Sequence, residues 1–427
     1  MFQTLKNAWK VPELKKKLLF TLLIVLLYRL GAQIPVPYAG AAYVSGISQL
    51  SEGLLGYLNL MSGSAFSQAT LFALSVSPYI TASIVVQLLT VAIPALERWS
   101  KDGEEGKKKI NLLTRIITIV LALVTSYGYM NIVSSYGLLT ATGFFQKAVV
   151  VACYCAGAAI IMWMAEKINE HGIGNGISII LFVNILSGGF NMVSAVWDMI
   201  VNNDNLVVGI LLGVLSIAIT LAVTVLVVLV TNSERRIPIQ YAKRVVGRKM
   251  YGGQNTNLPI KINMSGVMPI IFASSIVSIP ATFAAFFPKV GWLRAVTNFL
   301  GYDSWVYLVI NIILIIAFSY FYIMISFNPV EVANNIKNNG GAIPGVRTGK
   351  PTVDFINKIL GKITFIGAIF LCFVAGFPML VNMISGGNLA GLAFGGNSLL
   401  IVVGVALETV RELEAQITMR NYKGFLD

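Results

Sequence analysis

Long apolar runs recur along the chain, and polar segments separate them. A helix needs roughly 17 to 25 predominantly apolar residues to cross the hydrocarbon core of a bilayer. Ten runs have about this length, with approximate limits 18–35, 74–94, 112–135, 147–166, 174–195, 206–231, 265–288, 305–327, 362–382 and 396–413. The pattern predicts ten transmembrane helices.

The composition supports a membrane protein. Of the 427 residues, 56% are hydrophobic and only 11% are charged, and the mean hydropathy is +0.78. A soluble domain carries about a quarter charged residues. The chain is therefore expected to be an all-α integral membrane protein. Its three cysteines (Cys153, Cys155 and Cys372) fall inside apolar runs, which favours a role as small apolar side chains over disulfides.

The placement of Lys and Arg predicts the orientation. Cytoplasmic loops of membrane proteins carry an excess of these residues. With the N-terminus inside, 27 of the 31 lysines and arginines fall on the inner side, three on the outer side and one, Arg29, within the first run. Both termini are therefore predicted to be cytoplasmic. The same rule accounts for most of the net charge of +13 without a nucleic-acid partner.

One phrase occurs twice. Residues 76–83 read VSPYITAS and residues 267–274 read VMPIIFAS, and each phrase lies near the start of the second run in its half of the chain. Five runs per half give the halves opposite topology, so the repeat favours two inverted, pseudo-symmetric halves, 1–200 and 201–427. The alternative is that membrane helices often begin near proline and small residues.

A shorter apolar segment, GLLGYLNLMSGSAF, runs from Gly53 to Phe66 on the predicted outer side. It is too short to span a bilayer. Irregular backbone at membrane depth is tolerated only inside protein or facing a cavity. The segment is predicted to re-enter the helix bundle, and an interfacial helix is the alternative.

The familiar motifs of catalysis and of ion coupling are missing. The stretch GVRTGK (345–350) lacks the spacing of a phosphate-binding loop, HGIGNG (171–176) follows no strand, and the only histidine, His171, falls in a short inner loop. Ion-coupled carriers usually keep a charge near the membrane midplane. Glu408, on the inner half of the last run, comes closest. Any driving energy is therefore expected to come from a partner.

Two inner loops, at about 232–263 and 328–361, are long for connections in a compact bundle. The stretch 234–261 contains seven basic residues with interleaved aromatics, and 328–351 is rich in Asn, Gly and Pro. Such loops bind RNA phosphates, acidic protein surfaces or anionic lipid. A role in topology alone is the alternative.

Together these residues resemble the SecY/Sec61-alpha family of protein-conducting channels over nearly the whole chain. The resemblance rests on YRLGAQIPVP (28–37), LNLMSGSAFSQATLFALSVSPYITASIVVQLL (58–89), HGIGNGISII (171–180), IQYAKR (239–244), NMSGVMPIIFASSI (263–276), FNPVEVANNIKNNGGAIPGVR (327–347) and NSLLIVVGVALE (397–408). Thr348 departs from the family, where proline is common after the arginine.

The resemblance implies an hourglass channel with several functional groups of residues. A ring of aliphatic side chains closes its waist, at Val76, Ile80, Ile177, Leu181, Ile271 and Ile401. A re-entrant plug at about 53–65 contributes Leu54, Leu55, Tyr57, Leu58, Leu60 and Met61. A lateral gate between the second and seventh spans contains Pro78, Thr81, Ser83, Gln87, Pro269, Phe272 and Ser274.

The basic loops match the family's docking site for a motor ATPase and the ribosome, at Arg235, Arg236, Lys243, Arg244, Arg248 and Arg347. The resemblance implies a non-enzymatic channel without cofactor or metal in the bacterial plasma membrane. It would translocate unfolded secretory polypeptides and insert membrane helices laterally. Its partners would be small SecE-type and SecG-type subunits, a SecA-type motor, the ribosome, signal peptides, preproteins and anionic lipids. From the residues alone, a secondary transporter for a small solute is the rival, and an intramembrane enzyme lacks a catalytic constellation.

Overall fold

The computed structural model describes residues 2–38, 59, 62–135, 139, 143–201, 206–241, 244–246, 249–251, 255–286, 304–384 and 395–423. Contacts group the chain into two compact units. The first comprises residues 1–216, 274–308 and 401–427, and the second comprises residues 217–273 and 309–400.

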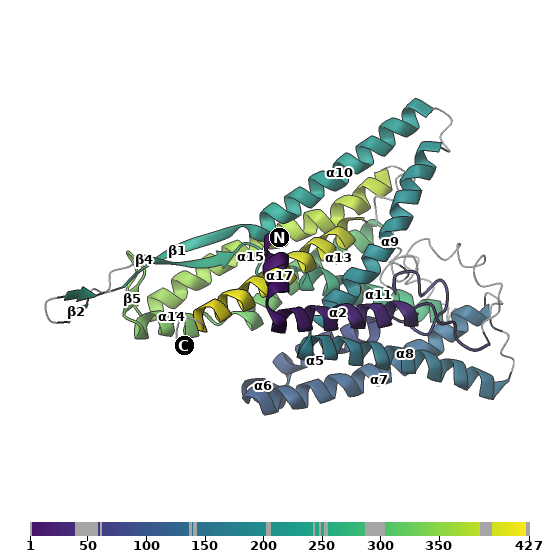
Figure 1. Cartoon of the computed structure of the whole chain (residues 1–427), viewed down its shortest axis with the longest axis horizontal. Coiled ribbons are helices and arrows are strands. Elements are labelled where there is room, and N and C mark those ends of the chain that lie inside the picture. The colour runs from purple at the N-terminus through teal and green to yellow at the C-terminus, as the bar shows by residue number, and fades with distance from the viewer. Residues whose placement is uncertain are drawn as a thin grey trace. The chain divides into compact units, whose positions relative to one another are not determined.

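Each of the ten predicted runs coincides with a helix (Figure 1). In chain order these are α2 (Pro12–Gly31), α5 (Ser77–Ala92), α7 (Gly103–Ser135), α8 (Phe144–His171), α9 (Gly176–Val201), α10 (Leu206–Asn232), α11 (Met268–Phe286), α13 (Trp305–Ser326), α15 (Lys350–Ile384) and α17 (Gly395–Lys423). Within the described residues three shorter helices accompany them: α1 (Phe2–Lys10), α6 (Pro94–Lys101) and α14 (Pro329–Asn338). The helical architecture of the prediction is confirmed.

Within the described residues, five helices are long and apolar enough to cross a membrane by length and composition: α7, α8, α10, α13 and α15. Helices α5 and α6, bent by 103° at the break before Pro94, make a sixth if they count as one span. Helix α2 is long enough but carries Lys15, Lys16 and Lys17 in its first half and Arg29 near its end. The protein is a multi-pass membrane protein.

Several helices extend beyond their apolar runs, because hydropathy detects only the lipid-facing part of a helix. Helix α15 begins at Lys350, whereas the run begins at 362. In its added turns Ile356 and Leu360 are buried while Lys358 is exposed, so this stretch is amphipathic. Helix α5, in contrast, begins at Ser77, three residues after the start of its apolar run, because residues 63–76 form turns and a single bridge.

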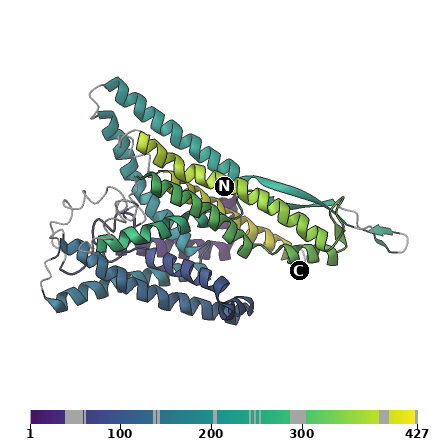
Figure 2. The same cartoon turned by 180° about the vertical axis from the view of Figure 1, so that it is seen from behind.

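A small antiparallel sheet in the second unit was not predicted. Strand β1 (Glu234–Tyr241) pairs with β4 (Asn255–Lys261) along its length and with β5 (Gly341–Ala342) through Gln240 and Tyr241. A hairpin of β2 (Arg244–Val246) and β3 (Lys249–Tyr251) follows β1. Figure 1 and the reverse view in Figure 2 both show the long strands beside helix α15.

The sequence carried a signal for β1. Ile237 and Ile239 are buried while Arg236, Pro238 and Gln240 are exposed, and this alternation is typical of a strand with one buried face. The finding adds a small sheet to a chain that is otherwise helical in its described part.

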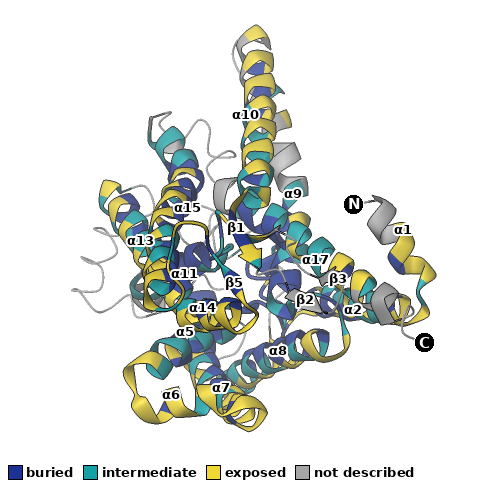
Figure 3. Cartoon of the chain, turned by 90° about the vertical axis from the view of Figure 1, so that its left-hand side faces the viewer, coloured by how far each residue is buried: buried dark blue, intermediate teal, exposed yellow. Residues whose placement is uncertain are grey.

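Helix α10 buries little of its surface. Figure 3 shows helix α10 with a mostly exposed surface, and the large apolar side chains Val214, Ile217 and Leu221 on it are more than half exposed. In a soluble protein such an exposed apolar patch would promote aggregation. On a helix of this hydropathy the exposed side chains face lipid.

Candidate functional site

The repeated proline phrase marks the start of two helices. Helix α5 begins at Ser77 and helix α11 at Met268, each one residue before a proline of the phrase, Pro78 and Pro269. Proline suits the first turn of a helix, because its fixed φ is helical and the missing N–H has no intrahelical partner there. The phrase therefore has a local explanation in helix initiation, whether or not the halves are related by symmetry.

The six aliphatic ring positions lie on four helices or directly before them. Val76 (1% exposed) directly precedes α5, and Ile80 (4% exposed) lies in the first turn of that helix. Leu181 (1% exposed) lies in α9 and Ile401 (2% exposed) in α17. These four residues belong to the first unit. Ile177 is half-buried in the first turn of α9. Ile271 of α11 (5%) belongs to the second unit.

The predicted gate residues of α5 are half-buried apart from Pro78, which is buried. Thr81 donates its hydroxyl hydrogen to the Ser77 carbonyl at 3.1 Å, and Gln87 donates to the Ser83 hydroxyl at 3.3 Å. These side chains therefore engage their own helix.

On α11, Pro269, Phe272 and Ser274 are buried. The Phe272 ring lies edge-on to Phe318 of α13, 5.8 Å between centroids, within the second unit.

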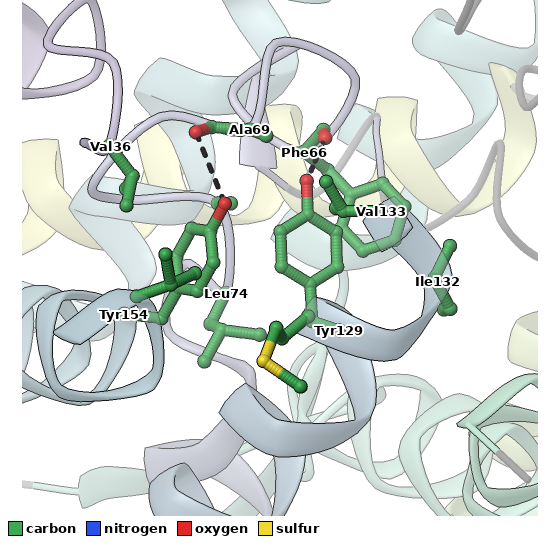
Figure 4. Packing of buried hydrophobic residues seen from close by; sticks show 11 residues of the cluster. Val36, Phe66, Ala69, Leu74, Tyr129, Ile132, Val133 and Tyr154 are labelled. Atoms are coloured by element: carbon green, nitrogen blue, oxygen red, sulfur yellow. Dashed lines mark hydrogen bonds between the residues drawn. The ribbon is translucent and has the colours of Figure 1, made fainter. Parts of the chain in front are cut away.

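Residues 62–76, the turn segment, lead into helix α5 without regular structure. Tyr129 of α7 donates its hydroxyl to the Phe66 carbonyl, and Tyr154 of α8 donates to the Ala69 carbonyl at 3.4 Å (Figure 4). The two tyrosine rings meet edge to face, 4.9 Å between centroids. These buried tyrosines thus satisfy backbone groups that no helix or sheet pairs. Sequence reasoning missed them, because only tertiary contact reveals which tyrosine faces a carbonyl.

A single backbone bridge supports the same segment. Thr70 pairs with Pro35, and the Leu71 amide donates to the Ile34 carbonyl at 2.9 Å. Helix α8 comes so close that a Cβ at Gly157 would lie 2.0 Å from the Leu71 carbonyl oxygen. The predicted plug residues immediately before it lie outside the described residues: Leu54, Leu55, Tyr57, Leu58, Leu60 and Met61.

The two long loops share one folded surface in the second unit, defined here as the sheet region (β1, β4, β5, α14 and the start of α15). Its core is aliphatic and is formed by Ile237, Ile239, Ile260, Ala333, Ile336, Ile343, Ile356, Leu360 and Ile363. Asn328 caps α14 by accepting from the Val330 and Glu331 amides. The loop that is rich in Asn, Gly and Pro is therefore ordered, and its strand β5 completes the sheet of the basic loop.

Basic side chains cover the outside of the sheet region. Arg235 and Arg236 of β1 are exposed, as is Arg347 in the turn between β5 and α15. Arg236 pairs with Glu234 at 2.7 Å, and the Arg347 carbonyl accepts from the Thr352 hydroxyl at 2.8 Å. The backbone of Arg347 is thus held while its guanidinium faces solvent.

Three members of the predicted docking set remain without a structural description of their side chains. Lys243 and Arg248 lie outside the described residues, and of Arg244 only the backbone, in β2, is described. Among the described residues no three His, Cys, Asp or Glu side chains gather in a way that could hold a metal ion.

Comparison with known proteins gives a consistent picture. The family model for SecY matches residues 70–410. Protein translocase subunit SecY of Streptomyces galbus is 42% identical over 441 residues, and that of Bacillus subtilis is 40% identical over 433; each alignment covers 100% of both chains.

Solved structures share the fold. A protein-conducting channel has a TM-score of 0.63 at 18% identity, and Sec61 in the canine ribosome-channel complex has a TM-score of 0.59 at 16% identity. Each comparison covers 96% of both chains. At such identities the structures establish similarity of fold.

Proposed function

The chain belongs to the SecY family, and from this premise we propose that it forms the protein-conducting channel of a bacterial protein translocase. The observation that carries the proposal is the identity of about 40% with translocase subunits over the full length of both chains. The resemblance found in the sequence motifs is confirmed. A solute transporter and an intramembrane enzyme have no counterpart among the relatives named above.

The proposed role is that of a passive conduit. Unfolded secretory polypeptides cross the bacterial plasma membrane through the channel, and membrane helices leave it sideways into lipid between α5 and α11. The channel itself is not an enzyme, and a partner motor or the ribosome supplies the driving force. Both termini are cytoplasmic in this proposal, as the distribution of Lys and Arg predicts.

The ring residues suit a seal that accepts any sequence. Aliphatic side chains grip a passing chain through dispersion contacts, which are weak individually and non-directional. A constriction lined only by such side chains also blocks ions by dewetting. We therefore assign the seal to Val76, Ile80, Ile177, Leu181, Ile271 and Ile401, with the plug at about 53–65.

The sheet region suits a docking surface. It exposes Arg235, Arg236 and Arg347 on a folded base, and exposed arginines recognise carboxylates and phosphates through paired hydrogen bonds. Acidic faces of a SecA-type motor and ribosomal RNA offer these groups. Small SecE-type and SecG-type subunits, signal peptides and anionic lipids complete the proposed set of partners.

The proposal is tested by trapping a polypeptide in the ring. A channel with Cys153, Cys155 and Cys372 replaced by serine receives Ile80→Cys and is reconstituted with small SecE-type and SecG-type subunits and a SecA-type motor. A secretory precursor with a folded domain that stalls it part-way and one cysteine is offered with ATP and then oxidised. We expect a disulfide only with ATP and only at precursor positions in mid-channel.

The matched control is Ile116→Cys on helix α7, whose side chain is 53% exposed on the apolar surface. No disulfide is expected there, because that side chain faces lipid. Translocation without any crosslink at position 80 would refute the ring assignment. Failure to translocate at all, beside an established translocase in the same assay, would refute the proposed function.

A further inference from the structure

A buried polar pair lies next to two of the proposed ring residues in the first unit. Ser75 immediately precedes Val76, and Asn184 follows Leu181 by about one helical turn. The Asn184 Nδ2 atom donates a hydrogen bond to the Ser75 Oγ atom at 3.2 Å. The two residues are 0% and 4% exposed. One hydrogen bond therefore joins Ser75, two residues before helix α5, to the first half of helix α9.

The backbone at Ser75 is unusual. Its φ is +49°, in the left-handed region that residues other than glycine rarely adopt. Ser64 (φ +72°) and Ala69 (φ +41°) in the same turn segment share this conformation. Such strain persists only where surrounding contacts over-determine it, and it gathers at functional sites. The turn segment is therefore held in place by its neighbours.

Helix α2 braces the same positions. The Arg29 guanidinium donates to the Val183 carbonyl at 3.0 Å and, more weakly, to the Gly63 carbonyl at 3.5 Å. Tyr28, fully buried beside it, stacks on Phe72 of the turn segment, 5.5 Å between ring centroids. Two adjacent residues of α2 thus contact helix α9 at Val183 and the turn segment at Gly63 and Phe72.

Gly63, near the start of the turn segment, is tightly packed against Arg29 and Asn184. A Cβ at Gly63 would lie 3.0 Å from the Arg29 Nη1 atom and 3.1 Å from Asn184, and the φ of Gly63 is +63°. Only glycine adopts this conformation freely and lets a backbone carbonyl approach the guanidinium this closely. Asn184 therefore lies against Gly63 as well as bonding to Ser75.

Polar contacts of this kind fix register in a way that apolar packing does not. Aliphatic side chains can slide past one another at little cost because dispersion contacts are non-directional. A buried amide that loses its partner pays the desolvation penalty in full, because no water replaces the partner inside a membrane bundle. The Ser75–Asn184 bond therefore favours one placement of α5 relative to α9.

We propose that Ser75 and Asn184 are positioning residues of the ring, setting where Val76 stands relative to Leu181 and so how tightly the resting channel excludes ions. This inference rests on the proposed function, because the ring is assigned there. It predicts that the two residues control the resting seal without contacting the translocating polypeptide.

The test measures the resting ion leak of vesicles that contain the full channel with its small partner subunits, normalised to the amount of channel. The variants are Ser75→Ala, Asn184→Leu and their combination. Ser75→Gly is a second way to remove the hydroxyl, and it suits a φ of +49° better than alanine does. The matched control is Ser126→Ala on helix α7, which removes a buried serine hydroxyl that bonds only to its own helix, at Ala122.

We expect Ser75→Ala, Ser75→Gly and Asn184→Leu each to raise the leak about fivefold, since losing one buried hydrogen bond shifts a two-state population by about that factor. Ser126→Ala should leak like the parent protein. Because the two residues share this bond, the double variant should leak less than the product of the two single effects. A purely structural role would instead lower the melting temperature of Ser75→Ala and Ser126→Ala alike, without a selective leak.

A leak equal to that of Ser126→Ala in all three single variants would overturn the inference, as would a double variant whose leak is the product of the two single effects. Precursor translocation by the parent protein, measured on the same vesicles, reports separately on the proposed function. Translocation with an unchanged leak would leave the function standing and remove only the positioning role.

Discussion

The sheet region and the turn segment 62–76 satisfy their backbone groups in different ways. In the sheet region, β1 pairs residue by residue with β4 from Glu234↔Lys261 to Gln240↔Asn255, and isoleucines from β1, β4, α14 and α15 fill the space beneath. In the turn segment, isolated hydrogen bonds pair these groups: turn bonds within the segment, hydroxyl donors from tyrosines of α7 and α8, and the Ile34 carbonyl, which accepts from the Leu71 amide. The sheet region is built like a soluble domain, with an apolar core and a basic surface.

The difference predicts different weaknesses. An aliphatic core loses stability in proportion to the apolar volume removed from it. A segment held by close approach of another helix tolerates missing volume better than added volume, because neighbouring backbone cannot move aside. The next three predictions compare these two regions, from the largest expected change in stability to the smallest.

Ile239→Ala should weaken the sheet region most. Ile239 is 4% exposed in its core, and the cavity left by such a truncation costs about 3 kcal/mol. Faster hydrogen exchange of the β1 and β4 amides, with a lower melting temperature, is the expected result. The same change at Ile217, 52% exposed on α10, should cost less than about 0.5 kcal/mol. Equal effects at the two sites would contradict the aliphatic core described for the sheet region.

Gly157→Ala should disturb the turn segment. The added Cβ would lie 2.0 Å from the Leu71 carbonyl oxygen, so α8 must shift away, at a cost of about 2 kcal/mol. Thermal unfolding in lipid nanodiscs measures the loss.

The control for this variant is Gly361→Ala on α15, where an added Cβ would meet nothing within 4 Å. Because alanine has the higher helix propensity, that variant should gain about 0.5 kcal/mol. A loss of stability at both glycines would show that the close approach of α8 is not what distinguishes Gly157.

Arg347→Glu should leave stability within about 0.5 kcal/mol, because its exposed side chain lies outside the core. Its effect should fall on the partner: translocation-stimulated ATP hydrolysis by a SecA-type motor should be lost. Lys358→Glu, a charge reversal at another exposed position of the same unit, serves as the control. Full stimulation in the Arg347→Glu channel would remove Arg347 from the docking surface.

The helical framework was accessible from the sequence, because long apolar runs leave a membrane segment no other regular structure. All ten runs coincide with helices. The boundaries were less accessible. Helix α15 begins twelve residues before its apolar run, and these added turns are amphipathic, with Ile356 and Leu360 buried. A hydropathy window assigns such an amphipathic stretch to a loop. Strand β1 was missed although its alternation from Arg236 to Gln240 was visible.

The ring positions came from the family resemblance, and their burial in the structure follows from apolar chemistry in helix starts and helix interiors. The contacts of Ser75 and Asn184 had no comparable signal. Asn184 lies 109 residues from Ser75 in the chain. The sequence of an apolar run does not show in which direction its asparagine side chain points. Which polar groups meet depends on how α2, α9 and the turn segment pack.

By itself the sequence determined that this chain is a multi-pass helical membrane protein of one recognisable family, because hydropathy, charge placement and motif order are local properties. Tertiary structure alone decided that two distant loops form one sheet, with Tyr241 opposite Gly341. It also decided that carbonyls of the turn segment, those of Phe66 and Ala69, are met by Tyr129 and Tyr154. Hydrogen bonds and close approaches depend on geometry between elements, and no local pattern records it.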